Sequence, residues 1–148
     1  MSHSFRIVLL RANAVFLLAA SAGGMINDLL GAFLLRGPIG LVVDKAPHAA
    51  IGFVEAHGLA FIFGVLLWRA ESARLWHATA AAIHVLLGAS NLLFWPLFAF
   101  ADMMMVGYVT TALHGLFACL QLVAACGAKA GAGRPGPNRG PEFHMTIL

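Results

Sequence analysis

Four long apolar segments decide what this chain can fold into. A helix needs about 20 mostly apolar residues to cross the hydrocarbon core of a bilayer, and four stretches have that length, about 12–35, 49–68, 78–98 and 103–126. Because lipid offers no hydrogen-bonding partners, each segment must satisfy its own backbone, which predicts α-helices. The strands of a membrane barrel would be shorter and would alternate apolar with polar residues, which none of these segments does. The sequence therefore predicts an all-α integral membrane protein, a four-helix bundle over residues 1–127.

The amino-acid composition indicates that lipid surrounds part of this protein. Of the 148 residues, 61% are hydrophobic and 10% are charged, whereas a soluble domain carries about 25% charged residues. The formal net charge of +3 is small and the basic residues are scattered, which argues against a nucleic-acid-binding surface. The expected partners are the lipid bilayer and, within it, another membrane protein or further copies of this chain.

Residues typical of helix ends stand between the segments. Arg36-Gly37-Pro38 predicts the end of the first helix, residues 44–47 lead into the second, and the charged run 69–74 is a short turn. Pro96 predicts a kink or an early end in the third helix. Residues 128–148 are rich in Gly and Pro, cannot build a core, and predict a flexible cytoplasmic tail.

The first segment also has features of a secretory signal. Arg6 and Arg11 precede an apolar run that reaches the small residues Ala20-Ser21-Ala22. Hydrophobicity resumes after Gly24 and continues to Leu35, which is too long for a signal core. An uncleaved first helix is the preferred interpretation.

The distribution of Lys and Arg predicts the orientation. With four spans, the N-terminus, the 69–74 turn and the tail share one side, and that side carries Arg6, Arg11, Arg69, Arg74, Lys129, Arg134 and Arg139. The opposite side carries Arg36 and Lys45. Because loops rich in Lys and Arg stay in the cytoplasm, we expect both termini there, in a multi-pass protein of the inner or plasma membrane.

Polar side chains within the spans are the candidate functional residues, because ionisable groups at membrane depth normally face the bundle interior or a cavity. The candidates are Asn27, Asp28, Glu55, His57, His84, Asn91 and His114. Together with small residues and further polar ones they form stripes at helical spacing, which suit close packing with interhelical hydrogen bonds. We expect these stripes to face one another. Packing alone is a sufficient role for Asn13, Asn91, Thr110, Thr111 and Gln121.

Depth singles out Glu55. At about 1.5 Å of rise per residue, Glu55 falls in the outer half of the membrane, as do Asn27, Asp28 and Asn91, while His57 and His114 fall near its middle. We expect a polar cluster built from all four helices, centred on Glu55 and open to the outside. Glu55 and His57 lie about 200° apart around their helix at 100° per residue, so both need not face inward. Asp28 is alternatively an ordinary solvated group near the outer surface.

A quinone and a b-type haem are the cofactors that such a cluster suggests. Glu55 with His57, His84 or His114 would relay protons or bind a polar head group such as a quinone ring. Bis-histidine haem ligation needs two histidines at equal depth on facing helices, and His57 and His114 meet the depth requirement. The sequence has no CxxCH motif for covalent haem, and it has no HExxH motif, phosphate-binding glycine loop or other metal site.

Residues 55–69 resemble the second helix of the DoxX-like family of small four-helix membrane proteins. In that family a Glu is followed by a nearby Gly, a second Gly and a basic residue at the cytoplasmic end, and here these positions are Glu55, Gly58, Gly64 and Arg69. The resemblance implies a small membrane subunit. In some members of the family such a subunit is tied to quinone-linked oxidation of sulfur compounds or to oxidative-stress complexes.

Three functions follow from these patterns. The preferred hypothesis is an accessory or redox-associated membrane subunit with a polar site inside the bilayer. The alternatives are a membrane-embedded enzyme or quinone- or haem-linked redox carrier that uses Glu55 and the histidines, and a small proton-coupled transporter that works as an oligomer.

We expect the untagged full-length chain to stay with the membrane fraction through an alkaline carbonate wash and to be released by detergent. The physical reason is that the four segments would expose far more apolar surface to water than a soluble protein tolerates. Sedimentation followed by immunodetection measures the distribution. Recovery of a monodisperse species in detergent-free buffer would contradict the membrane assignment.

Overall fold

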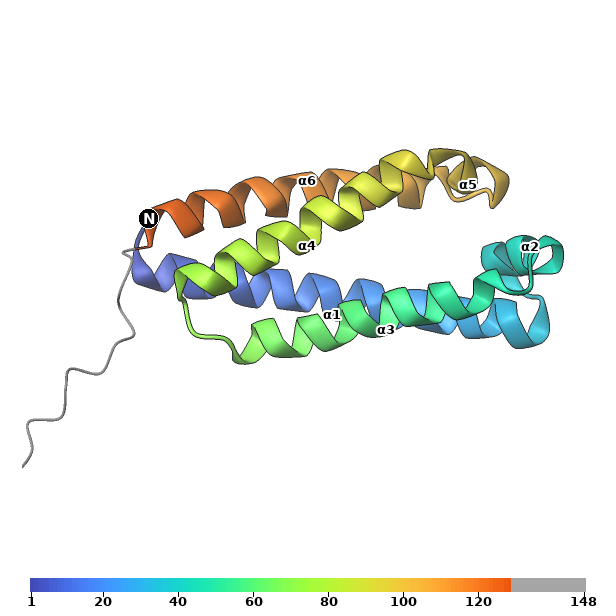
Figure 1. Ribbon diagram of the computed structural model, residues 1–148, viewed down its shortest axis with the longest axis horizontal. Helices are drawn as coiled ribbons and strands as arrows, with labels where there is room; N and C mark the ends of the chain where they lie inside the picture. The colour runs from blue at the N-terminus through green and yellow to red at the C-terminus, as the bar shows by residue number, and fades with distance from the viewer. Residues whose placement is uncertain (129–148) are drawn as a thin grey trace, which may run out of the picture.

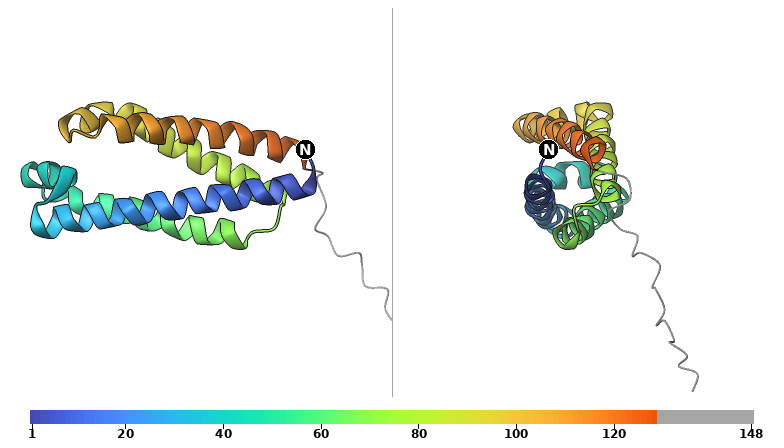
Figure 2. Two further views of the ribbon diagram at one scale, coloured as in Figure 1. Left: turned by 180° about the vertical axis from the view of Figure 1, so that it is seen from behind. Right: turned by 90° about the vertical axis from the view of Figure 1, so that its left-hand side faces the viewer.

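The computed structural model describes residues 1–128, and this part of the chain is helical with short connections (Figure 1). The helices are α1 (His3–Leu34), α2 (Gly37–Lys45), α3 (Ala49–Arg69), α4 (Arg74–Leu93), α5 (Trp95–Phe100) and α6 (Met104–Gly127). The four long helices run as two antiparallel hairpins, α1 with α3 and α4 with α6 (Figure 2). The predicted all-α class is confirmed. The predicted tail lies almost entirely outside the described residues.

Three of the helices, α1, α3 and α6, are long and apolar enough to cross a membrane. Their outward faces carry large apolar side chains, as Phe33 at 79% exposed and Met105 at 74% exposed illustrate. Helix α4 is not among these three, so the fourth span stays a prediction.

Two of the predicted spans have different ends in the structure. Helix α1 begins at His3 because the Ser2 hydroxyl accepts a hydrogen bond from the Phe5 backbone N–H at 3.2 Å, which caps the helix. The predicted third span, 78–98, is divided at Phe94 into α4 and α5, with Pro96 in the first turn of α5. The predicted interruption at Pro96 is confirmed, since proline has no N–H to continue the ladder of α4.

Helix α2 was not expected. Pro38 suits the first turn of a helix, where the backbone N–H has no partner. Leu35 at φ 51° and Gly37 at φ 72° occupy the left-handed region and reverse the chain, so that α2 folds back beside α1. The buried face of α2 consists of Ile39, Gly40, Val42 and Val43. This apolar run directly after Pro38 is the signal that would have predicted the helix.

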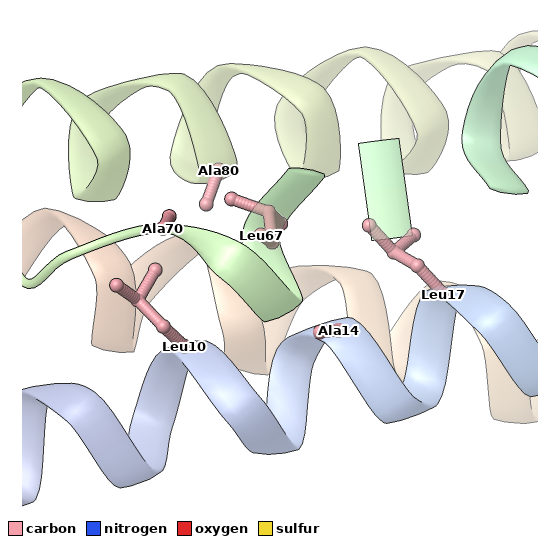
Figure 3. Close-up of a cluster of buried hydrophobic side chains, with 6 residues drawn as sticks. All are labelled: Leu10, Ala14, Leu17, Leu67, Ala70 and Ala80. Carbon is pink, nitrogen blue, oxygen red and sulfur yellow. The ribbon is translucent and has the colours of Figure 1, made fainter. Parts of the chain in front are cut away.

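The inward face of α1 repeats every three or four residues, as Leu10, Ala14, Leu17, Ser21, Asp28 and Gly31 show. Such spacing gives a left-handed, coiled-coil-like seam. At the end of the bundle that holds the N-terminus, three of these residues form a core with Leu67, Ala70 and Ala80 (Figure 3). The alanines let the helix backbones approach closely.

Two arginines of α1 bind the carboxyl ends of other helices. Arg6 Nη1 donates to the Gly127 carbonyl at 3.0 Å, and Arg11 Nη1 donates to the Leu67 carbonyl at 2.9 Å. These carbonyls lie in the last turns of α6 and α3, where intrahelical partners are lacking and positive charge is favourable. The N-terminus, the 70–73 connection and the end of α6 therefore meet at one end of the bundle, which we call the N-terminal end.

We predict that Gly31→Ala destabilises the protein by about 1–3 kcal/mol, whereas the matched change Gly23→Ala, also in α1, does not. A Cβ atom at Gly31 would lie 2.9 Å from the backbone of Ile39 and Gly40, and at Gly23 it would meet nothing within 4 Å. Denaturant titration in detergent micelles measures the free energy of unfolding. Equal effects of the two changes would contradict the close packing of α2 on α1.

Candidate functional site

A continuous row of hydrogen-bonded side chains runs from the N-terminal end into the middle of the bundle, and we call it the polar chain. Its members, in order, are Arg6, Ser72, His77, Gln121, Asn13, His84 and His114. Asn13, His77 and Gln121 are 0% exposed and His84 is 1% exposed. The polar chain therefore joins α1, α4, α6 and the 70–73 connection through buried polar groups.

The first half of the polar chain has a defined donor order. Arg6 can only donate, so its Nε–H gives a hydrogen bond to Ser72 Oγ at 3.2 Å. Gln121 Oε1 can only accept, so His77 Nδ1, at 2.6 Å from it, carries the hydrogen. His77 Nε2 is then an acceptor in the neutral ring, and Ser72 Oγ donates to it at 3.1 Å.

The second half continues in the same direction. Gln121 Nε2 donates to Asn13 Oδ1 at 2.9 Å, which leaves Asn13 Nδ2 to donate to His84 Nε2 at 2.6 Å. Because Nε2 of His84 accepts, Nδ1 carries the hydrogen and donates to His114 Nδ1 at 2.9 Å. The hydrogen of neutral His114 is therefore on Nε2, and every donor in the polar chain points toward His114.

His114 ends the polar chain among aromatic rings. The ring of Phe16 lies 5.6 Å from that of His114, and the ring of Phe117 lies 5.1 Å from that of His84. His114 is 8% exposed, and its Nε2 makes no hydrogen bond within residues 1–128. Within residues 1–128, Asp28 Oδ1 is the one fully buried side-chain N or O atom that lacks a hydrogen bond. Nε2 of His114 also lacks a hydrogen bond but is not fully buried, so it retains some exposed surface. A donor in such apolar surroundings forms strong hydrogen bonds.

A second polar group joins α1 to α3. His57 Nδ1 lies 2.6 Å from Asp28 Oδ2, and Asp28 is 1% exposed. A Cβ atom at Gly24 would overlap the imidazole of His57, so the ring packs directly on the backbone of α1. Asp28 is therefore not the ordinary solvated group that its position in the sequence allowed.

A third polar group joins α4 to α6 farther from the N-terminal end. Asn91 Nδ2 donates to the hydroxyls of Thr110 at 3.0 Å and Thr111 at 3.1 Å. The hydroxyl of Thr110 donates in turn to the Val106 carbonyl at 2.7 Å. This is the interhelical hydrogen bonding that was expected of these residues.

The structure differs from the expected cluster centred on Glu55. Glu55 lies on the exposed face of α3, opposite His57, and makes no hydrogen bond or ion pair within residues 1–128. Asn27 is half-buried beside Gly37 and likewise makes no hydrogen bond among the described residues. The reason is that α3 packs mainly against α1 and turns only one face inward, and Glu55 is on the other. The other five candidates lie in three separate groups, and Glu55 and Asn27 belong to none of them.

The two histidines expected to ligate a b-type haem do not form a ligand pair. His57 binds Asp28 through Nδ1 and packs its ring on Gly24, whereas His114 shares a hydrogen bond with His84. They belong to different hairpins and have different partners, so the residues present do not fit this haem. Within residues 1–128, no group of three His, Cys, Asp or Glu side chains is arranged to hold a metal ion.

Sequence reasoning missed the polar chain as a unit. The sequence predicts a packing role for Asn13 and Gln121, places Arg6 on the cytoplasmic side and places Ser72 in the 69–74 turn. The available signal was equal spacing on two antiparallel helices, from 77 to 84 and from 114 to 121. A seven-residue step keeps side chains on one helix face. If His84 contacts His114, then His77, seven residues earlier on α4, contacts Gln121, seven residues later on the antiparallel α6.

Comparison with known proteins found no match for this chain, whether among protein-family models, curated proteins or solved structures. The resemblance of residues 55–69 to the DoxX-like family stays a prediction.

We predict that Asn13→Leu lowers the free energy of unfolding by about 1–3 kcal/mol, because it leaves buried groups of His84 and Gln121 unpaired. Asn27→Leu on the same helix removes a similar amide that makes no hydrogen bond, and it should change stability by less than about 0.5 kcal/mol. Unfolding in mixed detergent micelles measures both. An equal loss in the two variants would show that Asn13 has no special role in stability.

Proposed function

We propose that this chain is a small multi-pass protein of the inner or plasma membrane that serves as an accessory or redox-associated subunit. Helix α4 is the fourth span in this proposal. Its 20 residues correspond to about 30 Å, which matches the hydrocarbon thickness of a bilayer. Its lower hydropathy comes partly from His77, His84 and Asn91, whose polar atoms are hydrogen-bonded to α1 and α6 and are thereby shielded from lipid.

The placement of basic residues supports an orientation with both termini in the cytoplasm. Arg6, Arg11, Arg69 and Arg74 all lie at the N-terminal end of the bundle. That end also holds the last turn of α6. Basic residues close to the membrane favour the cytoplasmic side.

The observation that carries the proposal is the Nε2–H of His114, a donor at the end of the polar chain that has no partner within residues 1–128. Asn13 fixes the tautomer of His84, and His84 fixes that of His114. A fixed donor among aromatic rings selects a ligand or partner group that offers an acceptor oxygen. The carbonyl of a quinone head group has this chemistry, and its ring is compatible with the apolar side chains beside His114.

The amides of the polar chain argue against a proton channel. An amide nitrogen passes a proton on only by becoming an imidic acid, so Gln121 and Asn13 interrupt proton transfer from the N-terminal end. Beyond Asn13, direct exchange is confined to His84 and His114, whose Nδ1 atoms are 2.9 Å apart. A site that binds and positions a ligand agrees with this arrangement better than a continuous conductor does. No hydrogen bond or ion pair within residues 1–128 joins Glu55 to a histidine, so an enzyme that pairs them has no support there.

We predict saturable binding of decylubiquinone to the purified protein in uncharged detergent, detected as a rise in the thermal unfolding midpoint. His114→Phe should weaken binding by about tenfold, the value of roughly one hydrogen bond. His114→Gln should retain most of the affinity, because its amide accepts from His84 and still donates to the ligand.

The control is His48→Gln, which changes an exposed histidine outside the polar chain and should bind as the unchanged protein does. The proposal is refuted by unsaturable binding to the unchanged protein, or by equal affinity of His114→Phe.

A further inference from the structure

One oxygen of Asp28 has no partner. Asp28 is 1% exposed; its Oδ2 pairs with His57, and its Oδ1 is the one sealed side-chain N or O atom in residues 1–128 that lacks a hydrogen bond. Leaving such a group unpaired in the folded protein lowers its stability, and more so when the group is charged. The polar chain, by contrast, pairs its buried atoms completely up to His114. The unpaired oxygen of Asp28 therefore indicates a site for a ligand that donates a hydrogen bond.

The surroundings of Asp28 are shaped by two glycines on the same face of α1. Gly24 and Gly31 lie four residues before and three residues after Asp28, which places all three along one stripe. The ring of His57 fills the space at Gly24, and the backbone of α2 fills the space at Gly31. Asp28 thus lies on α1 between the point where α3 packs closely, at Gly24, and the point where α2 does, at Gly31. Because Oδ1 is sealed, a ligand reaches it when the side chain of His57, 38% exposed, turns aside.

His57 is also the one basic side chain of residues 1–128 that pairs with Asp28. No Lys or Arg side chain of residues 1–128 pairs with Asp28, and the basic residue of α2, Lys45, pairs with Asp44. His57 engages Oδ2 alone, so it leaves Oδ1 free whether the ring is neutral or charged. A carboxylate oxygen in apolar surroundings attracts a positively charged N–H donor, because charge-assisted hydrogen bonds are about twice as strong as neutral ones.

We propose that Asp28 and His57 form a binding site for a small protonated amine, whose N–H donates to Asp28 Oδ1. A divalent metal ion would need several further ligands, and no group of three His, Cys, Asp or Glu side chains is present in the described part of the chain. A protonated amine needs one short hydrogen bond to the carboxylate. Asp28 lies about 22 Å along α1 from Asn13, at 1.5 Å per residue. The amine site is therefore separate from the polar chain and does not rest on the function proposed above.

The test compares two salts at equal ionic strength, with purified protein in uncharged detergent at pH 8. Methylammonium carries N–H donors, whereas tetramethylammonium has the same charge and none. We expect methylammonium chloride to raise the thermal unfolding midpoint with the logarithm of its concentration, by about 5 °C at ten times its Kd, and tetramethylammonium chloride and sodium chloride to have no such effect. An equal rise with either control salt overturns the proposal, as does the absence of a rise with methylammonium.

The variant Asp28→Asn keeps the size of the side chain and removes its charge, so it should lose the response to methylammonium. The matched control is Glu55→Gln, which removes a carboxylate from the exposed face of α3 and should keep the full response. A response retained in Asp28→Asn, or lost in Glu55→Gln, overturns the assignment to Asp28.

A second measurement on the unchanged protein covers the case in which Asp28→Asn does not fold. Dicyclohexylcarbodiimide modifies carboxyl groups in apolar surroundings, and peptide mass spectrometry follows the modification of Asp28 and Glu55 separately. Methylammonium should slow the modification of Asp28 at least threefold and leave that of Glu55 unchanged. Equal rates at Asp28 with methylammonium and with tetramethylammonium overturn the proposal.

Discussion

The side-chain amide of Asn13 makes the buried polar contacts that join α1 to the opposite hairpin within residues 1–128. It accepts a hydrogen bond from Gln121 and donates one to His84, so one residue of α1 is tied to both helices of the opposite hairpin. The apolar seam around it, which includes Leu10 and Ala14, would tolerate a small shift along the helix axis. The amide does not, because a shift would break hydrogen bonds that have no replacement in apolar surroundings. Asn13 therefore fixes the register of α1 against α4 and α6.

The same amide has a chemical consequence at a distance. By donating to Nε2 of His84, Asn13 decides which nitrogen of that ring carries hydrogen, and His84 decides the same for His114. The contact that fixes the packing of the helices thus also makes Nε2 of His114 a hydrogen-bond donor. The pair Asp28–His57 is separate from this system, since it ties α1 to α3 in the half of the bundle where α2 covers α1.

The polar stripes in the sequence predicted part of the candidate site correctly. Helical spacing correctly placed His84, His114 and Gln121 on inward faces, because an apolar helix has few other places to pair its polar atoms. It failed for Glu55. A helix at the edge of a bundle has a single inward face, and spacing alone does not say which of two polar faces that is. Asp28 was underrated for a related reason, since α2 was not expected and its packing beside this part of α1 was not foreseen.

The sequence by itself determined the all-helical class, most of the long helices and the break near Pro96, because these depend on apolar length and on the missing N–H of proline. It also determined which histidines turn inward on α4 and α6. Only the tertiary structure decided that Asn13 stands between His84 and Gln121, that Glu55 faces outward and that Asp28 keeps one oxygen without a partner. The physical reason is that a hydrogen bond depends on positions within a fraction of an ångström across different helices, and periodicity along one helix does not contain that information.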